Sequence, residues 1–128
     1  MVYILCMEQL DNIYERLNTS AFRAKFKLDD KDIEYINKKG MDTIKEHAYD
    51  FITKRLAPAV IENDGKQTPM RGHPVFKAQH ACACCCRGCL EKWHRMPKGR
   101  ELRADEIDYI VNILMTWIDI KIKDKKVY

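Results

Sequence analysis

The sequence contains no long apolar run, and this absence excludes a membrane-spanning helix. The longest run, MVYILCM at residues 1–7, is far shorter than the roughly 20 residues that a helix needs to cross a bilayer. The same segment lacks the basic residues and the small-residue cleavage site of a secretory signal peptide. We therefore expect a cytoplasmic protein with no membrane contact.

Internal repeats and low-complexity segments are absent as well, and patterns typical of β-strands are weak throughout. Of the 128 residues, 46% are hydrophobic and 33% are charged, which is typical of a folded globular chain with the size of one domain. Apolar residues recur instead at helical spacing. The sequence predicts a small, mainly α, single-domain protein over residues 1–128, with a disordered or non-native start at 1–6 and a fraying tail at 121–128.

Capping residues and helix breakers indicate where these helices begin and end. Ser20 and Asp29 are expected to cap helices, and Gly40 is expected to end one. Pro74 suits the first turn of a helix that runs into a cysteine-rich segment, where Gly88 would interrupt it. Before Pro74, glycines and prolines follow one another closely, which predicts one long irregular loop at about 60–73.

Five cysteines and two histidines lie in HACACCCRGCLEKWH, residues 80–94. Neighbouring cysteines are poorly placed to form disulfides with each other, and cytoplasmic thiols are kept reduced. The Cys86-x-x-Cys89 spacing instead lets two thiolates face one soft cation, and His94 follows one helical turn later. His80, Cys82, Cys84 or Cys85 would complete the set. The segment predicts a zinc site of two or three cysteines and one or two histidines.

Three other interpretations use the same cysteines. An iron–sulfur cluster needs four thiolates, but the spacing matches no common ferredoxin pattern. In a redox site, Cys86 and Cys89 would alternate between dithiol and disulfide, with Arg87 and Lys92 favouring the thiolate. Free cysteines also fill space in protein cores. Zinc is the preferred interpretation, and the alternatives stay open.

The loop before Pro74 is a second candidate site. Lys66, Thr68, Arg71 and His73 lie among turn-forming residues and lead into the expected helix N-terminus. Such a combination of cationic side chains and backbone N–H groups is typical of sites that bind an anion or a phosphate group. The alternative is an ordinary solvated surface loop.

The formal net charge of +4 is concentrated beside the cysteines. Between residues 87 and 103 there are six basic and two acidic residues, which accounts for the whole excess. Basic residues interleaved with Trp93 favour contacts with a phosphate backbone, so we expect a surface that binds nucleic acid or another protein. Its predicted members are Arg87, Lys92, Arg95, Lys98 and Arg100. A solvated face without a partner is the alternative.

Several segments resemble the bacterial and phage family called domain of unknown function 4186: RLNTSAFRAKFKL, HAYDFITKRLAPA, NDGKQTPMRGHPVFKAQHA, CCRGCLEKWH and DEIDYIVNILMTWI. The resemblance runs from about Arg16 to Ile118. The family has no established activity, so the resemblance implies a shared fold without naming a reaction. In the family pattern, small or hydroxyl residues usually replace Cys82 and Cys84. The resemblance therefore moves the predicted ligand set to Cys85, Cys86, Cys89, His80 and His94.

Two functions fit these patterns. The first is a small metal-binding protein with a structural zinc site beside a surface that contacts nucleic acid or a partner. The second is an enzyme in which a metal-bound water or the Cys86 thiolate acts on a substrate held by Lys66, Arg71 and His73. The second requires that the loop at 66–73 lies over the cysteine-rich segment.

Overall fold

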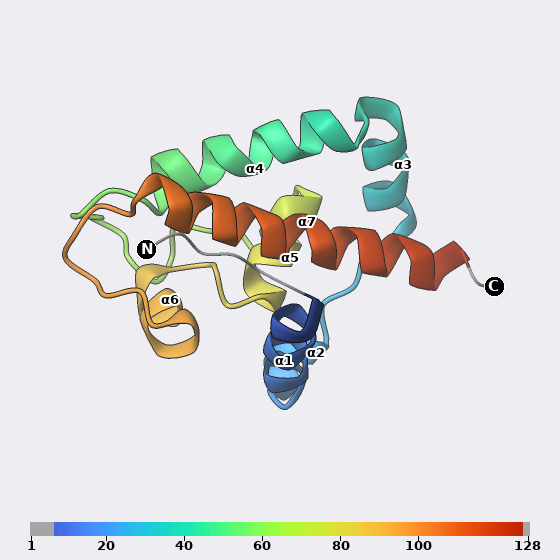
Figure 1. Ribbon diagram of the computed structural model, residues 1–128. Helices are drawn as coiled ribbons and strands as arrows, with labels where there is room; N and C mark the ends of the chain where they lie inside the picture. The colour runs from blue at the N-terminus through green and yellow to red at the C-terminus, as the bar shows by residue number, and fades with distance from the viewer. Residues whose placement is uncertain (1–6, 127–128) are drawn as a thin grey trace.

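The computed structural model describes the backbone of residues 7–126 and the side chains of residues 12–125. The described part is helical, without a strand, which confirms the mainly α class (Figure 1). The helices are α1 (Met7–Asn18), α2 (Ala21–Ala24), α3 (Asp30–Lys39), α4 (Met41–Arg55), α5 (Pro74–Ala81), α6 (Arg87–His94) and α7 (Ala104–Lys126).

Helices α4, α5 and α7 form the centre of the protein. Helix α7 packs along α4 and against α5, while α1, α2 and α6 lie on the side away from α4 (Figure 1). Apolar residues at helical spacing explain this packing, because each helix presents one apolar stripe to its neighbours. The fully buried residues include Ile44, Ala48 and Ile52 on α4, and Ile110, Leu114 and Ile118 on α7.

The predicted caps are confirmed. The Ser20 side chain accepts a hydrogen bond from the backbone of Arg23, and Asp29 forms a reciprocal capping box with Asp32. Gly40 joins α3 to α4 with φ at 88°, a left-handed conformation that glycine adopts at little cost. These local signals set the boundaries of the first half of the fold.

The cysteine-rich segment departs from the prediction, because α5 ends at Ala81 instead of continuing into it. Ala83 adopts a left-handed φ of 58°, and the backbone N–H of Cys84 donates to the carbonyl of Gln79 at 2.8 Å. This is a Schellman motif, which stops a helix, with alanine at the position that glycine usually occupies. Gly88 does not interrupt a helix either, since it lies in the first turn of α6.

The C-terminal tail also differs from the prediction, because α7 remains helical to Lys126. Ile122 is buried, and the Lys125 ammonium lies 2.8 Å from a carboxylate oxygen of Asp30 on α3. These contacts hold the last turns of α7 against the rest of the protein. The predicted disordered start at 1–6 lies outside the described residues, as do residues 127–128. Within the described range, no helix is both long enough and apolar enough to span a membrane.

Candidate metal centre

The first turn of α6 positions two cysteines. Cys86 is the N-cap residue, with an extended backbone, and its Sγ accepts a hydrogen bond from the Cys89 backbone N–H at 3.3 Å. This cap places the two thiols on the same side of the helix start, with their Sγ atoms 3.1 Å apart. Asp64 supports the turn from the preceding loop, because its carboxylate accepts from the Arg87 backbone N–H at 3.1 Å.

Cys85 adds a third sulfur from the residue before the helix. Its Sγ lies 3.6 Å from that of Cys89, and the sulfurs of Cys85, Cys86 and Cys89 are all within 4.8 Å of one another. We call these three residues the cysteine cluster. Cys85 is buried, whereas Cys86 and Cys89 are partly exposed. Among the described residues, this is the one place where three or more potential metal ligands converge so closely.

Arg23 of α2 brings a positive charge to the cluster. Its guanidinium contacts Cys89 Sγ at 3.1 Å and Cys85 Sγ at 3.6 Å, and it donates to the backbone carbonyl of His80 at 2.6 Å. The hydrogen bond from Cys89 lowers the pKa of the Cys85 thiol, and Arg23 lowers it further against the opposing effect of burial. No sequence motif marks Arg23, which is 62 residues away from Cys85 in the chain.

Cys82 and Cys84 lie outside the cluster, as the family resemblance implies. Both are fully buried among apolar side chains of the core. Burial raises the pKa of both thiols well above the usual value, because a thiolate is poorly solvated there. These two cysteines serve as small core residues.

His94 is also outside the cluster. Its Nε2 lies 2.8 Å from the backbone carbonyl oxygen of Cys82, and its Nδ1 lies 3.2 Å from the Tyr109 hydroxyl. Both ring nitrogens therefore have partners within the protein. Burial lowers the pKa of His94, so the ring is kept neutral in this environment.

His80 occupies a different position at the edge of the cluster. Its Nε2 lies 3.1 Å and 3.2 Å from the carbonyl oxygens of Thr68 and Pro69, which requires that Nε2 carries the proton. The ring stacks on Phe26, with the ring centres 5.5 Å apart. The His80 side chain thus connects the long loop to the segment that follows α2.

The loop at 66–73 packs against the cysteine-rich segment. The buried Thr68 hydroxyl donates to the backbone carbonyl of Cys85 at 2.8 Å, and Gln79 of α5 donates to the carbonyl of Cys84. The four predicted anion-binding side chains do not have the same surroundings, however. Lys66 and Arg71 are exposed to solvent, whereas Thr68 and His73 are buried.

His73 has a structural role that the sequence did not reveal. Its Nδ1 accepts a hydrogen bond from the Val75 backbone N–H, which caps α5, and its Nε2 lies 3.0 Å from Nδ1 of His47. Because Nδ1 accepts, the single proton of the neutral ring belongs on Nε2, which donates to His47. Burial and the nearby His47 lower the pKa of His73 to about 4.

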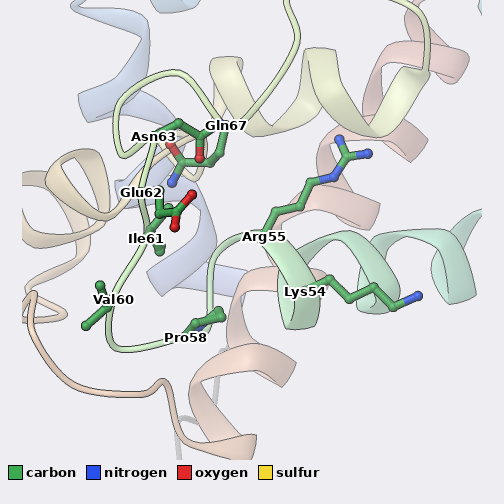
Figure 2. Close-up of a pocket in the computed structure, with 8 residues that line it drawn as sticks. All are labelled: Lys54, Arg55, Pro58, Val60, Ile61, Glu62, Asn63 and Gln67. Carbon is green, nitrogen blue, oxygen red and sulfur yellow. The ribbon is translucent and has the colours of Figure 1, made fainter.

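A cavity of about 460 Å³ lies beside the end of α4, and no cysteine lines it (Figure 2). Its cationic side chains have other partners. Lys54 forms an ion pair with Asp50, and the Arg55 guanidinium lies over the rings of Phe51 and Phe76. In Figure 2 both side chains extend away from the loop residues that form the other wall. The cationic side chains of this cavity therefore do not converge with the polar side chains of the loop wall.

The structure corrects the predicted basic surface at Arg87. This side chain is only 3% exposed, and its guanidinium donates to the backbone carbonyls of Leu56, Pro58 and Pro97. A buried guanidinium needs such acceptors. Through these hydrogen bonds Arg87 connects the end of α4, the long loop and the segment before α7. It is not available to a partner.

The other four predicted basic residues are at least partly exposed, but they differ in their partners. Arg100 forms a two-pronged ion pair with the buried Glu106, and Lys98 lies 3.9 Å from a carboxylate oxygen of Asp64. Lys92 on α6 and Arg95, directly after α6, are exposed.

A different basic and aromatic surface lies near the cluster, and of its residues no sequence motif marks the basic ones. Arg16 and Arg23 lie over the Trp93 ring, with their guanidinium carbons 5.7 Å and 5.8 Å from its centre. Lys25 lies 4.5 Å from the centre of the exposed Phe22 ring. We call this surface the Trp93 face: Arg16, Phe22, Arg23, Lys25 and Trp93.

The comparisons with known proteins identify a family. No solved structure shows a significant match to the chain. The family profile described as "Domain of unknown function (DUF4186)" matches residues 11–119, in agreement with the resemblance in the sequence segments. Because this match covers most of the chain, the protein belongs to the DUF4186 family.

Proposed function

We propose that the protein binds one zinc ion through the thiolates of Cys85, Cys86 and Cys89. The observation that carries this proposal is the convergence of three sulfur atoms within 4.8 Å of one another. A zinc–sulfur bond of about 2.3 Å implies sulfur separations of about 3.8 Å in a tetrahedral site. The observed separations of 3.1 Å and 3.6 Å thus require only small side-chain movements.

The charge of the surroundings fits this proposal. Three thiolates and one Zn²⁺ ion carry a net charge of −1, which is costly in a partly buried site. The Arg23 guanidinium contacts two of the sulfurs and would neutralise this charge. Hydrogen bonds to ligand sulfurs from such a neighbouring group are a common way of tuning a metal site.

The fourth ligand in this proposal is a solvent molecule or a bound small molecule. His94 uses both ring nitrogens elsewhere, and His80 is not among the side chains whose ligand atoms lie within 4.8 Å of one another. Three protein ligands with an open position are typical of catalytic zinc sites, whereas structural sites have four. The loop at 66–73, which packs against Cys85, would border this position.

Elemental analysis of protein purified without air tests the metal site. We expect about one zinc per chain, and substoichiometric zinc in Cys85→Ser, Cys86→Ser and Cys89→Ser. Cys84→Ala is the matched control, because Cys84 is buried outside the cluster and should keep the zinc. Wild-type protein without zinc, even after incubation with it, would contradict the proposal.

Two histidine variants test the ligand set. Because His94 is hydrogen-bonded elsewhere and His80 lies outside the converging group of ligand atoms, His80→Gln and His94→Gln should both retain about one zinc when they are folded. Replacement of zinc by cobalt gives an absorption spectrum that reports the number of thiolate ligands. Loss of metal from a folded histidine variant would add that histidine to the ligands.

A second proposal concerns the partner, which we infer to be single-stranded nucleic acid bound at the Trp93 face. Within the described part of the chain, no carboxylate lies within ion-pair distance of Arg16 or Lys25, whereas the Arg23 guanidinium is directed at the cluster sulfurs. Unpaired cations attract phosphates, and aromatic rings such as Phe22 and Trp93 offer surfaces on which bases stack. Lys92 and Arg95, predicted from the sequence, lie near Trp93 in the chain, Lys92 on α6 and Arg95 directly after it.

Fluorescence anisotropy with a labelled strand of about 20 thymidines tests this partner. The double variant Arg16→Gln/Lys25→Gln should bind more weakly and show a salt dependence reduced by about 1.4 in log–log slope. The control Lys38→Gln/Lys45→Gln removes the same charge on α3 and α4, away from the Trp93 face (Figure 1). Equal weakening by both variants would indicate attraction to net charge alone.

A further inference from the structure

Cys89 lies between two thiol neighbours, but its two contacts are not equivalent. Its Sγ is 3.1 Å from that of Cys86 and 3.6 Å from that of Cys85. A disulfide bond is about 2.05 Å long, so the nearer pair has to approach by only about 1 Å. The two residues also share the first turn of α6, where the Cys89 N–H already holds Cys86 Sγ in place.

The exposure of the three cluster side chains also favours a disulfide between Cys86 and Cys89. Cys85 is 8% exposed and contacts the Arg23 guanidinium, while its backbone is held by Thr68. Cys86 and Cys89 are partly exposed, so an oxidant reaches them first. Without a metal, two close thiols at a surface are good substrates for thiol–disulfide exchange.

We propose that Cys86 and Cys89 form a reversible disulfide by exchange with a small disulfide of the glutathione class, leaving Cys85 as a free thiol. The Cys86 thiolate attacks one sulfur of the oxidant, whose S–S bond breaks and releases one thiolate. Cys89 then attacks the Cys86 sulfur of the mixed disulfide and releases the second thiolate. The protein loses two electrons and two protons, and the oxidant becomes two thiols.

This reaction would also control metal binding, a consequence that rests on the proposed zinc site. The disulfide removes two of the three thiolates, and Cys85 alone is insufficient to retain zinc. Arg23 would remain beside Cys85, so the charge of the remaining thiolate stays compensated. Oxidation would therefore release the metal, and reduction by a dithiol would restore the site.

The disulfide is tested on metal-free protein, independently of zinc. After incubation with oxidised glutathione, the intact mass should fall by about 2 Da, and alkylation should label Cys85 but not Cys86 or Cys89. Tryptic cleavage after Lys77, Arg87 and Lys92 places Cys86 and Cys89 in different peptides. A disulfide should join peptides 78–87 and 88–92, and fragmentation should assign it to Cys86. A bond on Cys85, or no bond at all, would overturn the proposal.

Variants distinguish this pair from other thiol chemistry. Cys85→Ser should still form the disulfide, whereas Cys86→Ser and Cys89→Ser should stop at the reduced or glutathione-bound form. Cys84→Ala is the control and should behave like the wild type, because Cys84 is fully buried. Loss of the disulfide in Cys85→Ser alone would show that Cys85 is the reacting thiol and would contradict our assignment.

The same treatment of zinc-loaded protein tests the release of metal. A chromogenic zinc indicator should report about one zinc per disulfide formed. If the protein forms the disulfide but never binds zinc, the proposed function fails and the disulfide assignment stands. If it binds zinc but forms no disulfide in the metal-free state, the disulfide assignment fails alone.

Discussion

Arg87 shows how one buried charge organises the region around the cysteine cluster. Its guanidinium donates to backbone carbonyls of the α4 end, the long loop and Pro97, and the Arg87 side chain has no carboxylate among its hydrogen-bond partners there. Hydrogen bonds from a charged donor are worth about 1.5–3 kcal/mol each when a buried acceptor would otherwise be unsatisfied. A basic residue beside the cysteines is thus structural and not part of an exposed surface.

Replacing Arg87 with alanine should lower the free energy of unfolding by about 3 kcal/mol, because buried carbonyl groups lose their donor. Denaturation in urea measures this change. Lys92→Ala, on the exposed face of the same helix, should stay within about 0.5 kcal/mol of the wild type. A similar small change in Arg87→Ala would mean that water replaces the lost hydrogen bonds.

His73 should make stability depend on pH. Its folded-state pKa of about 4 lies below the unfolded value of 6.5, so the unfolded chain binds more protons between these values. Stability should therefore fall by about 2 kcal/mol as the pH drops from about 7.5 to about 5. His73→Asn, which can still cap α5, should lose most of this change. A full pH dependence in the variant would assign the effect to other groups, such as His94.

At the scale of the element, α6 is a short helix whose two ends serve different purposes. Its N-terminal end carries Cys86, as the N-cap, and Cys89, and the C-cap residue Arg95, which follows His94, adopts a left-handed φ of 59°. A residue with a Cβ atom is destabilised by about 1 kcal/mol in this conformation relative to glycine. The strain lies nine residues after Cys86 and six after Cys89, and it is confined to the exit of the helix.

Arg95→Gly should therefore stabilise the protein by about 0.5–1 kcal/mol, because glycine adopts the left-handed conformation without strain. Thermal unfolding measures the effect as a rise in Tm. Arg95→Ala removes the same exposed side chain but keeps the Cβ atom, so it should give no such gain. Equal Tm values for the glycine and alanine variants would contradict a left-handed end of α6.

At the scale of the whole molecule, the core and the cysteine cluster are largely separate. The buried core is built mainly on α4, α5 and α7, with further side chains from α1, α3 and α6 and with Cys82 and Cys84, and of the three cluster cysteines only Cys89 packs against it. A chain of this length buries enough apolar surface to fold without a metal. This distinguishes the protein from small zinc fingers, which are unfolded when the metal is removed.

Removal of zinc by a chelator should consequently leave the far-ultraviolet circular dichroism spectrum nearly unchanged. The free energy of unfolding should fall by about 2.7 kcal/mol relative to protein in zinc at 100 times its Kd. Urea denaturation of both forms provides the comparison. A loss of helix signal on chelation would show that the metal is needed for folding.

The positions of the helices follow from local patterns. Helical periodicity and caps such as Ser20, Asp29 and Pro74 act over a few residues, so they can be read without the fold. The end of α5 could not be predicted, because alanine at position 83 gives no sign of the left-handed turn. The continuation of α7 to Lys126 likewise depends on contacts with α3.

The sequence by itself determined the helical class, the family and the clustering of cysteines, since all three depend on residue types at short spacing. Only the tertiary structure decided which predicted residues share a site. It brought Arg23 onto the sulfurs, turned His94 toward Tyr109 and buried Arg87. These arrangements depend on how helices distant in the chain pack, and competing hydrogen-bond partners for each side chain appear only when that packing exists.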